Sequence, residues 1–289
     1  MDLTPVPDVR FLRVPQAVIH IPHASTHIPE EVRTTLLLDA QALHRELLVM
    51  TDWFTDELFT TSPDVATTVA FPVSRLVVDP ERFTDDDAEP MAVKGMGVIY
   101  ERTSTGALLR DAPTPGERTA LLQRYYEPHH VALAAAVASA LESGGTSLII
   151  DGHSFGSAPL PHEPDQASGR PDICIGTDTF HTPPGLVNRA ASLFRAAGWS
   201  VEIDQPFSGT IVPLQYYRHD QRVASVMIEI NRRIYIDEQT GAKLATFNQV
   251  RQTLSTVIEA LIRNDDNSNA RQGHAPVLTP PGSPGLPRR

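Results

Sequence analysis

Short apolar runs alternate with longer amphipathic stretches along this chain. Four stretches have the spacing of helices, with apolar side chains three and four residues apart. Between them lie runs rich in Val, Ile and Leu, of the kind that form strands in a buried sheet. This alternation predicts an α/β fold, a three-layer sandwich in which helices cover both faces of a mixed, mostly parallel sheet. The predicted helices span residues 39–59, 117–141, 184–197 and 243–262, and the predicted strands span residues 17–21, 75–79, 147–151, 172–176, 200–204 and 223–230.

These elements are predicted to form a single domain over residues 1–264. Residues 81–117 have weak periodicity, and we expect an irregular excursion beside the active site or a small hairpin layer there. Residues 265–289 contain five prolines and three glycines but almost no large apolar side chains. Such a segment cannot bury enough surface to offset the entropy of ordering, so we predict a disordered tail. The first dozen residues are predicted to form an arm.

Composition narrows the function classes by exclusion. The chain has 24 basic and 35 acidic residues, and the resulting charge of −11 argues against binding to a phosphate backbone. A single cysteine, Cys174, excludes an intrachain disulfide and a Cys-rich zinc module. The longest uninterrupted apolar stretch, residues 131–138, is too short to cross a bilayer, and the N-terminus lacks the pattern of a signal peptide. We therefore expect a soluble, cytoplasmic protein that binds neither nucleic acid nor membranes.

Polar residues follow the ends of several predicted strands. His23 follows the first strand, residues 79–82 the second, Asp151 and His153 the third, and residues 229–231 the last. Ligands bind at the carboxyl edge of open α/β sheets, so these side chains are candidates for one site. Two imidazoles and one carboxylate make the usual open catalytic zinc site. The alternative is that each histidine is a half-buried loop residue with no ligand.

Each charged residue near these strand ends could have a functional or a purely structural role. Asp151 lies two residues before His153 and could bond its far ring nitrogen, or could instead accept backbone N–H groups. Glu229 lies in an apolar strand, where burial would raise its pKa and suit it to move protons, or where Arg232, Arg233 or Arg75 could pair with it. Arg75 and Arg82 could each hold a substrate carboxylate, or could be surface groups.

Six segments occur in the order found in the N-formylglutamate amidohydrolase family, which this chain resembles from about residue 17 to residue 262. The resemblance implies the fold of the zinc carboxypeptidase and aspartoacylase superfamily, of which that family looks like a distant branch. The segments are Ile-Pro-His-Ala-Ser-Thr-His-Ile-Pro at His23, residues 75–82, Asp-Gly-His-Ser, Asp-Ile-Cys-Ile-Gly-Thr, Pro-Phe-Ser-Gly-Thr and Ile-Glu-Ile-Asn-Arg-Arg-Ile-Tyr-Ile-Asp.

The resemblance also implies roles for individual residues. His23 and His153 would bind zinc, and Glu229 would be the general base. Arg82 would hold the substrate carboxylate, and we expect Arg75 and Asn231 to assist it.

The chain departs from the superfamily pattern at two positions. Thr26 stands where an acidic metal ligand is expected, so the second ligand must come from elsewhere. Asp52 is our candidate, because the resemblance includes an Asp at this point of the first long helix, and His27 and Glu30 are the alternatives. Glu81 stands where the Asn beside the clamping arginine is expected, and a carboxylate there would weaken the grip on an anionic substrate.

These implications predict a zinc-dependent amidohydrolase that cleaves the formyl or acyl amide of an N-acyl amino acid. N-formylglutamate is the first expected substrate, giving glutamate and formate. Another divalent metal is the alternative to Zn²⁺. Two other functions remain open: a deformylase for another N-formyl amino acid or formyl amide in a specialised pathway, and a catalytically inactive ligand-binding relative. The expected partner is a small molecule, and the sequence does not fix an oligomeric state.

Overall fold

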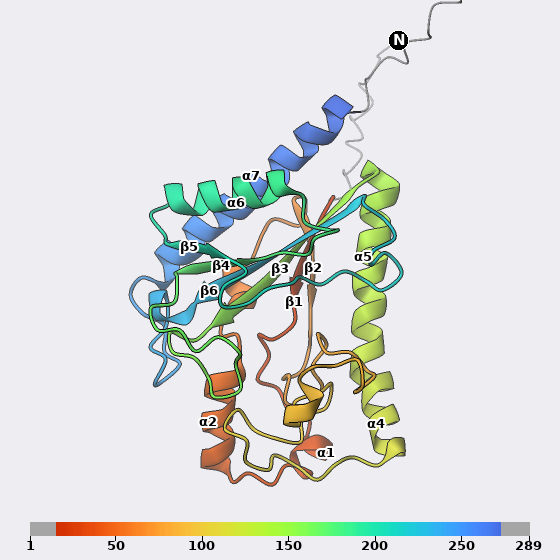
Figure 1. Cartoon of the computed structure of the whole chain (residues 1–289), viewed down its shortest axis with the longest axis vertical. Helices are drawn as coiled ribbons and strands as arrows, with labels where there is room; N and C mark the ends of the chain where they lie inside the picture. The colour runs from red at the N-terminus through yellow and green to blue at the C-terminus, as the bar shows by residue number, and fades with distance from the viewer. Residues whose placement is uncertain (1–15, 273–289) are drawn as a thin grey trace, which may run out of the picture.

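A computed structural model describes residues 16–272 of the chain, so the predicted N-terminal arm lies outside the described residues. Six strands form one mixed sheet at its centre (Figure 1). Their order across the sheet is β2-β1-β3-β6-β4-β5, and β4 is antiparallel to β6 while every other neighbouring pair is parallel. The mixed, mostly parallel sheet predicted from the sequence is confirmed. The strands are β1 (Ala17–Ile21), β2 (Ala66–Ala70), β3 (Ser147–Phe155), β4 (Ile173–Gly176), β5 (Val201–Ile203) and β6 (Val223–Asn231).

Helices cover both faces of this sheet, which makes the three layers that were predicted. The helix α5 (Glu127–Gly144) lies on one face, and α6 (Pro184–Ala196) and α7 (Phe247–Gln272) lie on the other (Figure 1). Alternate side chains of a strand point to opposite faces. Accordingly, Val18 packs in the cluster that includes Leu133 of α5, while Ile19 packs in the cluster that includes Phe194 of α6 and Leu254 of α7.

The remaining helices are short and lie mainly beyond the carboxyl ends of the parallel strands, toward the bottom of Figure 1. They lie around or within residues 71–110, most of which are irregular and some of which pack in small cores with Val32 of α1 and Leu43 of α2. They are α1 (Glu30–Arg33), α2 (Ala40–Met50), α3 (Thr55–Leu58), the 3₁₀ turn η1 (Ala92–Lys94), α4 (Pro115–Leu121), the π-helical turn η2 (Leu122–Tyr126) and the 3₁₀ turn η3 (Arg232–Ile234).

One predicted strand is wrong and one strand was missed. Residues 75–79 form a turn, in which Val77 N–H bonds to the Ser74 carbonyl. The apolar side chains there are fully buried, but they fill the small cores beside the sheet rather than the sheet itself. The edge strand is β2 instead. Its two threonines, Thr67 and Thr68, are exposed, so it lacks the apolar run that identified the other strands.

The predicted helix boundaries also shift in ways that affect the site. The helix expected over residues 39–59 is broken between α2 and α3, and Phe54 adopts the left-handed backbone conformation at φ 61°. The last helix continues to Gln272, eight residues into the segment predicted to be disordered, and residues 273–289 lie outside the described residues. Within the described part of the chain, no helix is both long enough and apolar enough to span a membrane.

Cys174 lies in β4 and is fully buried. Its thiol bonds to the Phe207 carbonyl, and in the sheet register it pairs with Glu229 of β6. Burial raises the pKa of the thiol to about 12. The only cysteine of the chain is therefore an unreactive core residue in the folded protein.

Candidate metal centre and active site

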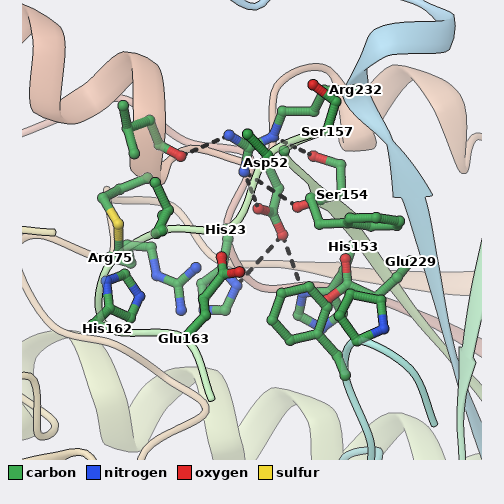
Figure 2. Close-up of a pocket in the computed structure, with 18 of the residues that line it drawn as sticks. His23, Asp52, Arg75, His153, Ser154, Ser157, His162, Glu163, Glu229 and Arg232 are labelled. Atoms are coloured by element: carbon green, nitrogen blue, oxygen red, sulfur yellow. Dashed lines mark hydrogen bonds and ion pairs between the residues drawn. The ribbon is translucent and has the colours of Figure 1, made fainter. Parts of the chain in front are cut away.

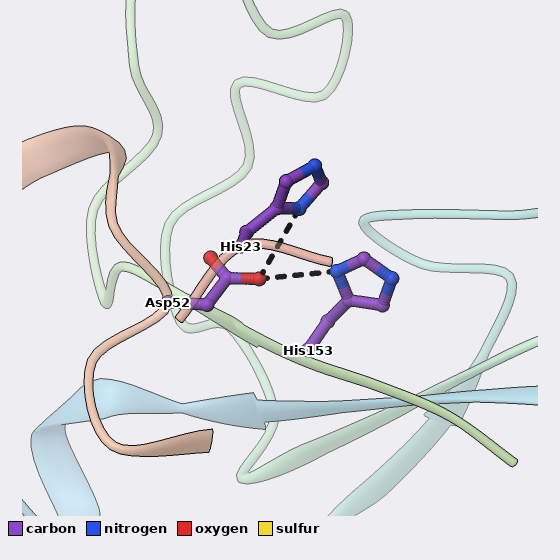
Figure 3. Close-up of side chains that lie close together, drawn as sticks. All are labelled: His23, Asp52 and His153. Carbon is purple, nitrogen blue, oxygen red and sulfur yellow. Dashed lines mark hydrogen bonds and ion pairs between the residues drawn. The ribbon is translucent and has the colours of Figure 1, made fainter. Parts of the chain in front are cut away.

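Three side chains predicted to bind metal lie together at the carboxyl end of the sheet (Figure 3). His23 follows β1, His153 lies in β3, and Asp52 occupies the break between α2 and α3. Asp52 Oδ2 lies 3.0 Å from His153 Nδ1 and 3.6 Å from His23 Nδ1. All three residues are at most 3 % exposed. The helix break creates this arrangement, because Asp52 N–H bonds to the His23 carbonyl and so fixes the carboxylate beside the first imidazole.

The donor set suits a divalent metal ion. His23 Nδ1 is buried and has no hydrogen-bond partner, although it faces the carboxylate of Asp52. An unsatisfied nitrogen is costly in a protein interior unless something binds it. Two imidazoles with one carboxylate are the ligands of an open zinc site. By contrast, His27 and Glu30 are exposed and belong to neither buried group of residues that could hold a metal.

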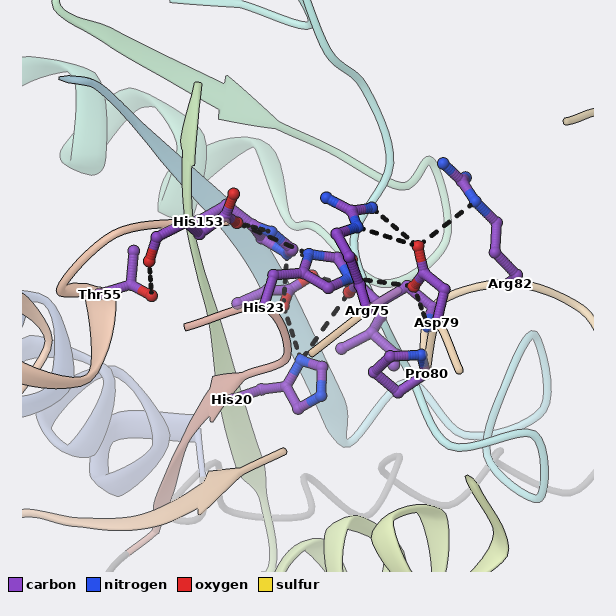
Figure 4. A network of polar contacts seen from close by, with 12 residues as sticks. His20, His23, Thr55, Arg75, Asp79, Pro80, Arg82 and His153 are labelled. Carbon is purple, nitrogen blue, oxygen red and sulfur yellow. Dashed lines mark hydrogen bonds and ion pairs between the residues drawn. The ribbon is translucent and has the colours of Figure 1, made fainter. Parts of the chain in front are cut away.

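Each imidazole is held from behind by a second carboxylate, and Figure 4 shows this for His23 and Asp79. His23 Nε2 donates to Asp79 at 2.9 Å, and His153 Nε2 donates to Asp151 at 3.1 Å. A proton held on Nε2 allows Nδ1 to offer its lone pair to a metal ion, which at His153 would replace the present hydrogen bond from Nδ1 to Asp52. Asp151 was predicted for this position, whereas the contact of Asp79 with His23 was not. Asp79 ends the predicted strand 75–79 and begins the polar segment 79–82. Its position at a strand end was the signal that could have identified it as a site residue.

Charge in this cluster is strongly coupled. Burial opposes ionisation of Asp52, but its hydrogen bond to His153 and the nearby imidazole of His23 hold its pKa well below the ordinary value. Burial and Arg75 lower the pKa of His23, but Asp79 and Asp52 together hold it above the ordinary value. The carboxylates therefore remain ionised and favour a positive charge at the imidazoles, whether it is carried by protons or by a metal ion.

Glu229 lies beside the metal cluster on the adjacent strand. It pairs with His153 in the register of β6 and β3, and it is 7 % exposed. Its Oε2 atom has no hydrogen-bond partner, and burial raises its pKa to about 8. Figure 2 shows the carboxylate next to His153 in the wall of the cavity. A carboxyl group that is desolvated but unpaired can take up and release a proton near neutral pH.

A cavity of about 520 Å³ opens over these residues. Arg75 and Arg82, which the sequence suggested as substrate-binding residues, both line it. Arg75 Nη2 donates to Asp79 at 2.8 Å, and Arg82 Nε lies 3.7 Å from the same oxygen. Asn231 does not line it. Its side chain is fully buried and bonds to the Pro171 carbonyl and the Arg233 N–H, so it stabilises the end of β6 instead.

Arg232 is a cavity residue for which the sequence suggested only pairing with Glu229. It donates to Asp52 at 3.2 Å and to the Val49 carbonyl at 2.6 Å, and it also bonds to Ser154. These contacts tie the end of β6 to the helix break. Arg232 thereby helps to hold the carboxylate of Asp52 in place.

Glu81 lies among the imidazoles. Its Oε2 is 3.2 Å from His153 Nε2 and 3.8 Å from His23 Nδ1, and its Oε1 is 3.8 Å from His20 Nδ1. Glu81, His20 and Asp151 form a second group whose donor atoms could hold a metal ion, although His20 already bonds to Asp151 at 2.8 Å. The position where an asparagine was expected thus brings a further negative charge to the cavity.

Comparisons with known proteins agree with the sequence resemblance. A model of the N-formylglutamate amidohydrolase family matches residues 16–236. The crystal structure of an N-formylglutamate amidohydrolase from Ralstonia eutropha JMP134 shares the fold, with a TM-score of 0.74, 23% sequence identity, and coverage of 90% of this chain and 96% of that one. A gene product of Agrobacterium tumefaciens is similar with a TM-score of 0.61 and 19% identity, over 86% of this chain and 92% of the other. No protein in the curated set matches the chain.

Proposed function

The chain belongs to the N-formylglutamate amidohydrolase family, and we propose that it hydrolyses the formyl or acyl amide of an N-acyl amino acid in a metal-dependent reaction. N-formylglutamate is the first substrate to test, and another N-formyl amino acid or formyl amide is the alternative. The observation that carries the proposal is the buried group of His23, Asp52 and His153 beside an unpaired Glu229, at the floor of a cavity.

His23 Nδ1, Asp52 and His153 Nδ1 would hold the cation, with Asp79 and Asp151 orienting the two imidazoles. We propose Zn²⁺, with another divalent metal as the alternative, because imidazole and carboxylate ligands suit it. When bound, such an ion polarises an amide carbonyl and lowers the pKa of a water molecule.

Glu229 is the proposed general base. It takes a proton from the attacking water and delivers it to the departing amide nitrogen, so that formate and the free amine are released. In the chain itself burial raises its pKa to about 8, even though the charge of His153 acts to lower it, and a divalent cation at the ligands would add positive charge and lower the pKa further. The loaded site therefore favours the ionised form that a base requires.

Arg82 and Arg75 are the proposed contacts for the substrate α-carboxylate. Arg82 is 26% exposed at its side chain, and its buried Nε lacks a hydrogen-bond partner. Arg75 is already bonded to Asp79 through two nitrogens, which fixes the plane of its guanidinium. Arg82 makes only long ion pairs, with Asp79 at 3.7 Å and Glu89 at 3.9 Å. A fixed guanidinium beside one whose N–H groups are loosely held can orient a carboxylate in a defined pose.

We further propose that the enzyme acts in the cytoplasm on a free small molecule. The decisive experiment measures metal content and formate release on the same purified sample. About one metal ion per chain together with formate release from an N-formyl amino acid supports the proposal. Metal binding without turnover of any N-acyl amino acid would identify the inactive ligand-binding relative instead.

A further inference from the structure

We infer that the substrate carries an apolar side chain, so that N-formyl derivatives of aliphatic or aromatic amino acids fit this cavity better than N-formylglutamate does. The inference rests on the proposed function and names its substrate class. The cavity combines a single binding position for a carboxylate with acidic and apolar walls.

Arg75 and Arg82, the proposed substrate-binding arginines, are placed to bind the same carboxylate. Arg75 Nη2 and Arg82 Nε both face the same atom, Asp79 Oδ2, at 2.8 and 3.7 Å. Two guanidinium groups that share one neighbouring oxygen are close enough to bind the same carboxylate, and Asp79 neutralises part of their charge. The α-carboxylate that every N-acyl amino acid carries would fill this position.

Apart from Arg75 and Arg82, no arginine or lysine among the described residues that line the cavity is free to bind another carboxylate. Arg232 is 8 % exposed, and its nitrogens already bond to Asp52, Ser154 and the Val49 carbonyl. His162 is the remaining basic group outside the metal cluster, and burial lowers its pKa, so it is neutral at pH 7. N-formylglutamate would bring a second carboxylate without a partner.

The other charged groups of the wall are acidic. Glu163 pairs with Arg170, and Glu238 accepts bonds from the backbone and hydroxyl of Ser157. Glu81 adds a third carboxylate, with its side chain 20% exposed. The charge of Glu163 is compensated by Arg170, but no arginine or lysine among the described residues pairs with Glu81 or Glu238. A carboxylate on the substrate side chain would meet these two like charges in a partly desolvated space, which selects against it.

Apolar side chains form the rest of the wall. Met91 and Leu160 line the cavity and are only partly buried, and both pack on the same small core. Phe207 lines it as well, supported by Phe155 at a ring distance of 5.8 Å. The volume of about 520 Å³ exceeds what a formyl group and a short side chain fill. A bulky apolar side chain would displace water from these surfaces, which favours binding.

The test compares kcat/KM of the metal-loaded full-length protein for four substrates: the N-formyl derivatives of leucine, phenylalanine, glutamine and glutamate. Glutamine matches glutamate in size and lacks its charge. We expect leucine or phenylalanine to exceed glutamate by about tenfold or more, the scale of discrimination in apolar pockets, and glutamine to exceed glutamate. Preference for glutamate over glutamine and leucine would overturn the inference while leaving the proposed function intact.

Two further measurements separate the inference from the function. If no N-formyl substrate is hydrolysed, the proposed function fails, and the rise in melting temperature with N-formylleucine against N-formylglutamate still measures the binding preference. Leu160→Arg places a cation in the apolar wall and should raise the glutamate-to-leucine ratio of kcat/KM by about tenfold, whereas Leu160→Met should leave it unchanged. Met91→Arg serves the same purpose if Leu160→Arg does not fold. An unchanged ratio in a folded arginine variant would contradict the inference.

Discussion

His23 and Asp79 are joined by a 2.9 Å hydrogen bond from the imidazole Nε2 to one carboxylate oxygen, while the other oxygen of Asp79 accepts two bonds from Arg75. Asp79 is fully buried. Burial raises the pKa of its carboxyl group, but the charges of Arg75 and His23 outweigh this and hold it well below the ordinary value. A single ionised side chain therefore fixes both a proposed metal ligand and a proposed substrate contact.

Replacement of Asp79 should affect both sites at once. Asp79→Asn keeps the shape but removes the charge, so we expect metal affinity to fall by about 10- to 100-fold, the usual effect of losing such a partner. KM should rise as well, because Arg75 loses its anchor. Titration with Zn²⁺ and steady-state kinetics measure the two effects. Asp87→Asn, an exposed aspartate eight residues further along the chain, is the control and should change neither. Unaltered metal affinity in folded Asp79→Asn would remove this role.

Individual removal of the three proposed ligands should empty the metal site. Elemental analysis of His23→Ala, Asp52→Ala and His153→Ala should each find a small fraction of the metal in the unmodified protein, because three protein ligands leave none to spare. His27→Ala is the matched control, since His27 was the alternative ligand and is exposed. Retention of metal by Asp52→Ala together with its loss from His27→Ala would reverse the assignment.

Replacement of the proposed base should differ from replacement of a metal ligand, because the variant protein should keep its metal. Glu229→Gln keeps size and removes the proton acceptor, so turnover should fall by roughly 10²–10⁴-fold while the metal stays bound. Glu238→Gln changes another glutamate of the same cavity, one that bonds to Ser157, and should reduce turnover far less. Near-normal turnover in a folded, metal-loaded Glu229→Gln protein would contradict the mechanism.

Loss of the proposed contact between Arg82 and the substrate carboxylate should raise KM. Arg82→Lys keeps the charge but loses the planar fork, so KM should rise by about tenfold with a smaller change in kcat. The effect should shrink for a substrate whose α-carboxylate is amidated. Arg124→Lys, at an exposed ion pair with Glu31, provides the control. Equal impairment on both substrates would make Arg75 the better candidate for the contact.

The sequence predicted those site residues that lie near or just beyond the carboxyl ends of strands, because parallel strands end at one edge of a sheet. His23, His153 and Glu229 come together for that reason, and Asp151 follows from the two-residue period of a strand. Asp52 was reached only through the family resemblance. The helical pattern of apolar residues over 39–59 continues across the break between α2 and α3 that positions Asp52. Periodicity therefore does not reveal that Asp52 lies outside a helix.

Other features depend on contacts between distant parts of the chain. Arg232 bonds to Asp52 across 180 residues, and no local pattern indicates such a pair. The run at 75–79 is buried as its composition suggests, but burial in a turn and burial in a strand require the same apolar residues. The strand β2 was missed for the opposite reason. Its threonines are exposed, and an edge strand needs little apolar surface, so no apolar run marked it in the sequence.

The burial of Cys174 makes this protein a reporter of its own opening motions. A thiol reagent can reach the only sulfhydryl of the chain when β4 separates from β6, and that separation also disturbs the strand that carries Glu229. The labelling rate therefore counts fluctuations at the wall of the active site, without an introduced probe. A ligand that holds the cavity together should slow this rate, so occupancy becomes readable by mass spectrometry even for compounds that are never hydrolysed.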